Sequence, residues 1–420
     1  MKKQSVLAMI AVSLWVVCAS AGEEEIIRIE SLVQEALAKN PKIASARERH
    51  LSLKEKIPQA GALEDPMLSF GVVNLPNNFD INEEDMTMKE ISISQKLPFP
   101  GKRGLSEDVA SKEADAGALE AEEAANQVAK EVKTAFYDLS HVYRSMEVTQ
   151  RNKSILEELA KITQTRYSLG QSIQEDVIRN QVEISKMVDD LTMLEQKKRA
   201  ITARLSYLLN RPPNGLLGKP AEIDFKPIAF SIEDLQQLAI ESNPMLKALK
   251  QDIAARGKGV ELARRDYFPD FSVKFAYGQR EDRLDMYTGM IEMNLPIFYK
   301  SKQERKVAEA YAEVRSSQAK FDGAQNEIFY MIADMGSMAQ RLERKIELYR
   351  TGIIPQSRLQ IDTALSAYMV NKADFMTLLD SRMRLYNYEL DYHGALTEYE
   401  KSLAALEAAV GKTFSREVVK

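Results

Sequence analysis

The chain contains little of the chemistry on which enzymes and metal proteins depend. Its 420 residues include one cysteine, Cys18, and three histidines. His50, His141 and His393 lie far apart, and none has a second imidazole or a carboxylate at a spacing typical of a metal site. The sequence also has no nucleophile elbow, phosphate-binding loop or paired-ligand motif. We therefore expect no catalytic residue, no structural metal site and no cofactor.

A strong excess of one charge is also missing. The formal net charge is −5, and acidic and basic residues alternate along the chain. Without a basic stripe, the sequence excludes a nucleic-acid partner. Long hydrophobic runs are absent after residue 21. If the mature chain enters a membrane, it must do so as strands.

The first residues predict a cleavable signal peptide over residues 1–21. Two lysines precede an apolar run over 6–17, and small residues follow the run. That run is shorter than the ~20 residues that a membrane-spanning helix needs. The mature chain should begin near Gly22 and contain no cysteine, which excludes disulfides and thiolate chemistry. Acylation of Cys18 is an alternative that the sequence leaves open.

The rest of the chain contains one pattern twice, with an offset of about 200 residues. Asn40-Pro41 returns as Asn243-Pro244, and Leu97-Pro98 returns as Leu295-Pro296. A near-constant offset along the whole chain indicates a tandem duplication of one long unit. The predicted division is a first repeat over 22–215, a second repeat over 216–411 and a C-terminal tail over 412–420.

Four segments have the alternation of apolar with polar or small residues that a strand requires. In one of them, Phe271, Val273 and Phe275 alternate with Ser272 and Lys274. Each segment has about the length that a tilted strand needs to cross the hydrocarbon layer of a membrane. The predicted strands cover residues 67–75, 90–97, 271–278 and 286–295.

Two environments are compatible with these strands. A soluble four-stranded sheet with one buried face is the first, although two hairpins separated by a long stretch of helix suit a soluble core poorly. A membrane barrel is the second, and it requires several chains because an open sheet edge is not tolerated in lipid. A dimer or a trimer would satisfy this requirement equally well.

Most of the remaining chain is predicted to be helical. No proline lies between Gly104 and Leu169. Residues 104–210 predict a long helical hairpin, whose first arm could reach on the order of 100 Å at ~1.5 Å per residue. The second repeat predicts long helices over 300–352 and 373–411, with a break or kink marked by Gly352 and Pro355. The predicted fold is therefore mainly α with a small β part, a duplicated unit of coiled-coil helical hairpins and β-hairpins.

Two segments carry a resemblance to a known family. Arg166-Tyr167-Ser168-Leu169-Gly170 opens a segment, continuing to residue 181, that resembles the first periplasmic turn of the TolC-like outer-membrane efflux family. Residues 367–380 resemble the second turn. Together with the Asn-Pro pairs and Ala409-Val410-Gly411, the resemblance extends over essentially the whole mature chain.

This resemblance implies a homotrimer that forms an α-barrel tunnel and a twelve-stranded β-barrel in the outer membrane. It implies that the protein is not an enzyme but the exit duct of a tripartite efflux system. The implied partners are a periplasmic adaptor, an inner-membrane transporter of the RND type, and outer-membrane lipid. The implied location is the outer membrane of a Gram-negative bacterium, with the helical part in the periplasm.

The resemblance also assigns roles near the two turns. Two positions that ring the periplasmic aperture in the family correspond to Asp176 and Arg179 after the first turn and to Thr377 and Asp380 after the second. A ring of Asp380 from several chains would bring like charges together and attract cations. The neutral Thr377 removes one acidic ring from the family pattern, which leaves cation selectivity by a double ring unsupported.

Tyr368 matches a tyrosine that helps to hold the entrance shut in the family. The basic partner that the family has two places past the turn is Ala373 here, and Lys372 lies one place earlier. Gly170 and Asn371 suit the left-handed backbone of a helix C-cap, so turn chemistry alone is one interpretation of them. The other interpretation is an adaptor-docking tip that consists of Arg166, Tyr167, Gly170 and Asn371.

The substrate class rests on resemblance alone. Residues 97–103 and 374–380 resemble the heavy-metal branch of the family, which favours export of heavy-metal cations. Multidrug efflux or type I secretion is the alternative for a duct, and a soluble periplasmic coiled-coil adaptor is the alternative from another class. Two groups of methionines suggest copper, but core packing is the expected explanation. They are Met286, Met290 and Met293, of which the first two share the predicted lumen face, and Met331, Met335 and Met338.

Overall fold

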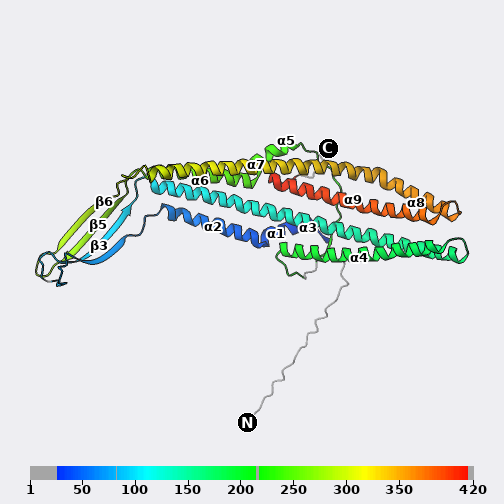
Figure 1. The fold of residues 1–420 in the computed structure, drawn as a ribbon, viewed down its shortest axis with the longest axis horizontal. Helices are drawn as coiled ribbons and strands as arrows, with labels where there is room; N and C mark the ends of the chain where they lie inside the picture. The colour runs from blue at the N-terminus through cyan, green and yellow to red at the C-terminus, as the bar shows by residue number, and fades with distance from the viewer. Residues whose placement is uncertain (1–25, 82, 214–216, 415–420) are drawn as a thin grey trace, which may run out of the picture.

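The computed structural model describes residues 26–81, 83–213 and 217–414. The predicted signal peptide with Cys18, the predicted boundary between residues 215 and 216, and residues 415–420 of the tail lie outside the described residues. Figure 1 shows a long, narrow molecule with a sheet at one end and two helical tips at the other. The described part is mainly helical with a small sheet, as the sequence predicted.

The two β-hairpins join into one antiparallel sheet. It consists of β2 (Met67–Val73), β3 (Met88–Leu97), β5 (Phe271–Gln279) and β6 (Met286–Met293), in that order. The hairpins meet where β3 pairs with β5, for example at Ile93 and Phe275. Within the described sheet, β2 and β6 are therefore edge strands, each with one side unpaired.

Near the sheet, four helices lie side by side in one layer. Their order across the layer is α2 (Pro41–Gly61), α3 (Lys102–Ser168), α6 (Pro244–Arg265) and α7 (Gln303–Leu348). The α3 helix has no internal proline, and its buried alanines, such as Ala114, allow neighbouring helices to approach closely. At ~1.5 Å per residue it has a length on the order of 100 Å, so it extends into both halves of the molecule.

Toward the tips, α3 has different neighbours in the layer. Here α3 packs between α4 (Gln174–Leu208) and α9 (Phe375–Val410), and α9 packs in turn against α8 (Ile354–Met369). The layer thus contains one helical hairpin from each half of the chain, α3 with α4 and α8 with α9 (Figure 1). The α3–α9 contact is the seam between the two hairpins.

The helical rod of the second half does not end at Gly352, where the sequence analysis placed its end. It passes from α7 through one π-helical turn, η1 (Tyr349–Ile353), and continues as α8 to Met369. Pro355 is the second residue of α8, and because it has no N–H it cannot donate a hydrogen bond to the turn before it, where η1 lies. The predicted break is therefore a local π-bulge.

The two Asn-Pro pairs have the same structural role. Asn40 ends α1 (Ile29–Lys39), accepts a hydrogen bond from the main chain of α2 and donates one to the Leu208 carbonyl at 2.8 Å. Asn243 ends α5 (Ile232–Ser242), caps α6 and donates to the Ala409 carbonyl at 2.9 Å. Each pair thus fixes a short helix and a long helix against the end of a hairpin. Two short strands, β1 (Ile26–Ile27) and β4 (Lys219–Pro220), pair in parallel nearby.

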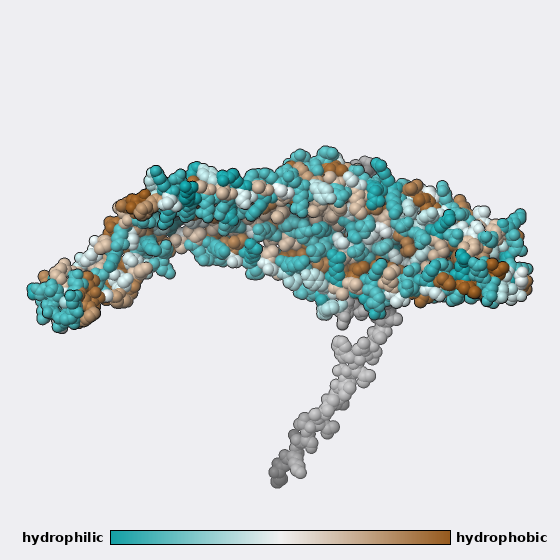
Figure 2. Space-filling model, in the orientation of Figure 1, coloured by the Kyte–Doolittle hydropathy of each residue, from teal (hydrophilic) through white to brown (hydrophobic). Residues whose placement is uncertain are grey.

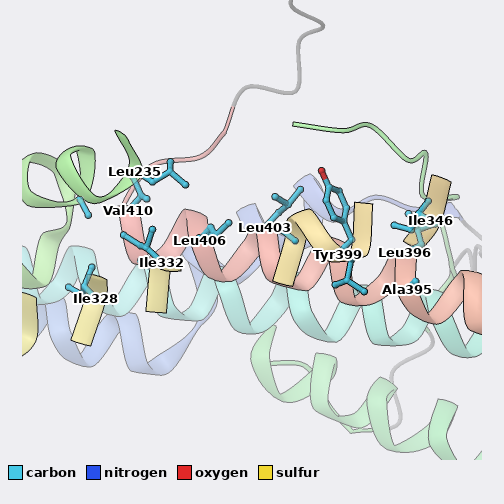
Figure 3. Packing of buried hydrophobic residues seen from close by; sticks show 14 of the residues in the cluster. Leu235, Ile328, Ile332, Ile346, Ala395, Leu396, Tyr399, Leu403, Leu406 and Val410 are labelled. Carbon is cyan, nitrogen blue, oxygen red and sulfur yellow. The ribbon is translucent and has the colours of Figure 1, made fainter. Parts of the chain in front are cut away.

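Three apolar clusters hold the helical layer together. Figure 3 shows one of them, in which Tyr399, Leu403 and Leu406 of α9 meet side chains of α5 and α7. A second cluster lies around α1 and α3, and a third lies near the tips. No helix in the described part of the chain is long and apolar enough to cross a membrane.

Candidate functional site at the helical tips and the sheet

Both tips end in the same hydrogen-bonded turn. At the first tip, the N–H of Gly170 donates to Tyr167 and the N–H of Gln171 donates to Arg166, which is the Schellman pattern. At the second tip, Asn371 donates to Tyr368 in the same way. Gly170 and Asn371 have φ values of +68° and +59°, the left-handed backbone that the sequence predicted.

The side chain of Arg166 joins the two tips. Its Nη1 donates a hydrogen bond of 2.8 Å to the main-chain carbonyl of Tyr368, and its Nη2 donates to Oδ1 of Asn371. The guanidinium also lies 4.4 Å from the centre of the Tyr368 ring, in cation–π geometry. Arg166 thus bridges α3 to the end of α8, which brings together two of the predicted tip residues and Tyr368.

Tyr368 is buried inside the tip. It is 4% exposed, and its ring lies 5.9 Å from that of Phe375 at the start of α9. Burial raises the pKa of its hydroxyl. In the single chain this tyrosine therefore fixes the packing of the tip. Ala373 has no charge, Lys372 and Tyr167 are exposed, and the cation that contacts Tyr368 comes from α3.

The predicted aperture residues after the first turn are held by their own helix. The hydroxyl of Ser172, just before α4, donates to Oδ2 of Asp176 in its first turn at 2.6 Å. Arg179 forms an ion pair of 2.9 Å with Glu175, one turn earlier. Asp176 and Arg179 therefore pair with near neighbours and not with each other.

After the second turn, Asp374 caps α9 by accepting a hydrogen bond of 2.8 Å from the Thr377 N–H. Hydrogen bonds with Thr377 lower the pKa of the Asp374 carboxyl. Thr377 and Asp380 are both exposed and lie one helical turn apart. No described residue forms a hydrogen bond or ion pair with the Asp380 carboxylate. Its charge is thus available to whatever lies against this face.

Further from the tips, the structure reveals a charged link that the sequence analysis missed. Glu389 of α9 is buried and forms ion pairs with Arg151 of α3 at 2.6 Å and with Arg358 of α8 at 3.1 Å. Nearby, Arg382 donates to the buried Asn152 at 2.8 Å. Arg151 and Glu389 are 238 residues apart in sequence, and Asn152 and Arg382 are 230 residues apart. No local spacing could have indicated the pairing.

The sheet has one apolar face, and no other described part of the chain covers that face. Phe70 is 72% exposed and Ile291 is 73% exposed, although these strands form a continuous ladder. Figure 2 shows hydrophobic surface at this end of the molecule and again at the tips. The register places the exposed side chains in rows across all four strands. The apolar face consists of Leu68, Phe70, Ile91, Ile93, Val273, Phe275, Tyr277, Tyr287, Ile291 and Met293.

A sheet with an uncovered apolar face and two unpaired edges, attached to a long helical layer, defines a membrane-associated class of protein. The family described as outer membrane efflux protein matches residues 32–211 and 235–412, and the chain belongs to this family. It is thus a transport protein of the outer membrane. The members of this family are channels and not enzymes.

Individual relatives agree in fold at low identity. Nodulation protein T of Rhizobium leguminosarum bv. trifolii is 20% identical over 412 residues, which is 92% of this chain and 86% of that protein. A solved structure of CusC has a TM-score of 0.79 and 15% identity, covering 91% of this chain and 92% of its own. VceC of Vibrio cholerae has a TM-score of 0.77 and 17% identity, covering 92% and 97%.

Proposed function

We propose that the protein is the outer-membrane channel of a tripartite efflux system and works as a homotrimer. The observation that carries this proposal is the sheet, whose apolar face is bare and whose two edges are unpaired. An open sheet edge is not tolerated in lipid, so the edge of β6 must pair with the β2 edge of another copy. Three copies of the four-stranded sheet would make a closed barrel of twelve strands.

The helical layers of the three copies would form the tunnel beneath this barrel. The polar face of the sheet, with Glu90, Ser92 and Lys274, would then face the lumen. Asp380 would form a ring near the closed end of the tunnel, because its carboxylate is exposed and unpaired. Such a ring favours the entry of cations. Asp176, Arg179, Thr377 and Lys372 would line the same entrance.

The tips are suited to docking of a periplasmic adaptor. Beside Arg166, Tyr167, Gly170 and Asn371, both turns expose apolar side chains to solvent, among them Leu169, Ile173 and Val370. Exposed apolar groups at the end of a capped helical hairpin indicate a contact surface. An inner-membrane transporter, of the RND type, would supply the energy on the other side of the adaptor.

Heavy-metal cations are the proposed substrates. The resemblance of residues 97–103 and 374–380 to the heavy-metal branch supports this assignment, and the unpaired Asp380 is compatible with it. Multidrug efflux or type I secretion through the same duct is the alternative.

The proposal is tested by growth of a deletion strain, with and without this chain, on copper, silver, zinc, cobalt and cadmium salts and on dyes and detergents. Metal sensitivity that the chain reverses is the expected result. Sensitivity to organic compounds alone would transfer the substrate assignment to multidrug efflux. Recovery of the chain as a soluble periplasmic monomer would overturn the channel itself.

A further inference from the structure

The structure separates the two groups of methionines that the sequence placed together. Met331, Met335 and Met338 pack against the buried cluster between α5, α7 and α9, as core packing predicts. The methionines of the sheet have no such role. Met286 is 39% exposed and Met290 is 43% exposed. Gap filling in a core cannot explain them.

The strand register places four methionines on the polar face of the sheet. Met290 of β6 lies opposite Lys274 of β5. Ser94 of β3 and Met67 of β2 continue the same cross-strand row. Met286 shares another row, with Gly278 of β5 and Glu90 of β3. Met88 lies two residues before Glu90 on β3, so it projects from the same face. Met293 lies in the row of Phe271, on the opposite, apolar face.

Met88 and Met286 both lie next to Gly278 on this face. The Sδ atom of Met88 lies over Gly278, in the space that a Cβ atom at position 278 would occupy. Met286 is the direct cross-strand partner of Gly278, and such partners have Cβ positions about 5 Å apart. The missing side chain of Gly278 therefore lets the thioether of Met88 approach that of Met286.

The surroundings can accept a cation, but its ligands would be the soft thioethers and not a cluster of carboxylates or imidazoles. Glu90 lies in the same row, and its carboxylate neutralises Lys274 through an ion pair of 2.8 Å. No group of three or more His, Cys, Asp or Glu residues in the described chain could hold a metal ion. The donors present at Gly278 are thioethers, which are soft ligands and select Cu(I) over Zn²⁺ or Mg²⁺.

We propose that Met88 and Met286, on either side of Gly278, form a two-thioether binding site for a soft monovalent cation, Cu(I) or Ag(I). The inference rests on the proposed function, because that function makes the polar face of the sheet face the lumen of the channel. It adds a point of contact for the cargo within the β part. Harder divalent cations should bind there far more weakly.

The test is a titration of Ag(I), as silver nitrate in chloride-free buffer, against the full chain purified in detergent, with a competing chromophoric chelator. M88L and M286L keep the side-chain volume and remove the sulfur, and each is expected to weaken Ag(I) binding by at least tenfold. M293L is the matched control, because it removes a thioether from the opposite face of the same strand. It should leave binding unchanged.

Gly278→Ala tests the geometry independently of sulfur, because its methyl group would displace Met88. Weaker Ag(I) binding by this variant, with the sheet intact by circular dichroism, is expected. Equal affinity of M88L, M286L and the unaltered chain would overturn the site. Equal loss in M293L would also overturn it.

The titration is separate from the growth assay of the proposed function. A chain that binds Ag(I) through these methionines but does not restore metal tolerance would refute metal export and leave the site standing. If the chain restores metal tolerance but M88L and M286L leave its Ag(I) affinity unchanged, the methionine site is refuted and metal export stands.

Discussion

The guanidinium of Arg166 donates a hydrogen bond of 2.8 Å to the main-chain carbonyl of Tyr368 and lies 4.4 Å from the centre of its ring. The two residues belong to different hairpins and are 202 positions apart. An opening of the tip that separates α3 from α8 must break this contact. The link is therefore a closing element of the tip within one chain.

Arg166→Ala is expected to loosen the tip. A hydrogen bond to a charged group contributes about 1.5–3 kcal/mol, and its loss would raise the population of separated tips roughly tenfold or more. Cells that carry the variant should become more sensitive to large hydrophilic antibiotics, which a minimum inhibitory concentration assay measures. Arg199→Ala is the control, because Arg199 pairs with Glu195 within α4 and lies away from the tip. Equal sensitivity of both variants would contradict the role of Arg166.

The seam between the hairpins gives a second prediction. Glu389→Gln would leave Arg151 and Arg358 facing each other without the carboxylate between them. Because the Glu389 side chain is only 9% exposed while both arginines are partly solvated, we expect a loss of about 2 kcal/mol in stability. Thermal unfolding followed by circular dichroism measures it.

Glu347→Gln is the matched control for Glu389→Gln. Glu347 pairs with Arg350 at 2.8 Å, but both side chains are exposed and lie on one stretch of helix. Exposed pairs of this kind contribute at most about 1 kcal/mol. If the two substitutions lower the melting temperature equally, Glu389 does not hold the seam.

The apolar face of the sheet gives a third prediction. Phe275→Lys places a charge in the middle of this face and should cost about 2–4 kcal/mol if the face contacts lipid. The variant should accumulate outside the outer-membrane fraction, as measured by fractionation and by heat-modifiable migration in gels. Ser69→Lys, on the polar face opposite Ser92, should assemble normally. The opposite pattern would mean that the polar face contacts lipid.

The sequence predicted what depends on local pattern. The alternation around Phe271 and the αL-prone residues Gly170 and Asn371 were sufficient to place strands and tip turns, because these features depend on near neighbours. The pairing of β3 with β5 and the link from Arg166 to Tyr368 depend on how two distant units pack. The same is true of Glu389. The closed barrel and the trimer stay predictions, since they require other copies of the chain.

The ion pair of Glu35 and Arg211 gives a prediction on pH. Arg211 donates to both carboxylate oxygens of Glu35, at 2.9 and 2.5 Å, and joins α1 to the segment after α4. The hydrogen bonds from Arg211 lower the pKa of Glu35 from its usual value of 4.5. The pair therefore stabilises the fold fully above pH 4.5, and this contribution is lost as the pH falls through the lowered pKa of the folded state.

Glu35→Gln should consequently lower the melting temperature at pH 7, and the difference from the unaltered chain should shrink as the pH falls below 4.5. Melting curves from pH 7 to pH 3 measure this difference. Glu55→Gln, on the exposed face of α2, should show little effect at any pH. A difference for Glu35→Gln that stays constant over the whole range would mean that the ionised carboxylate does not supply the stability, and that the shape of the side chain does.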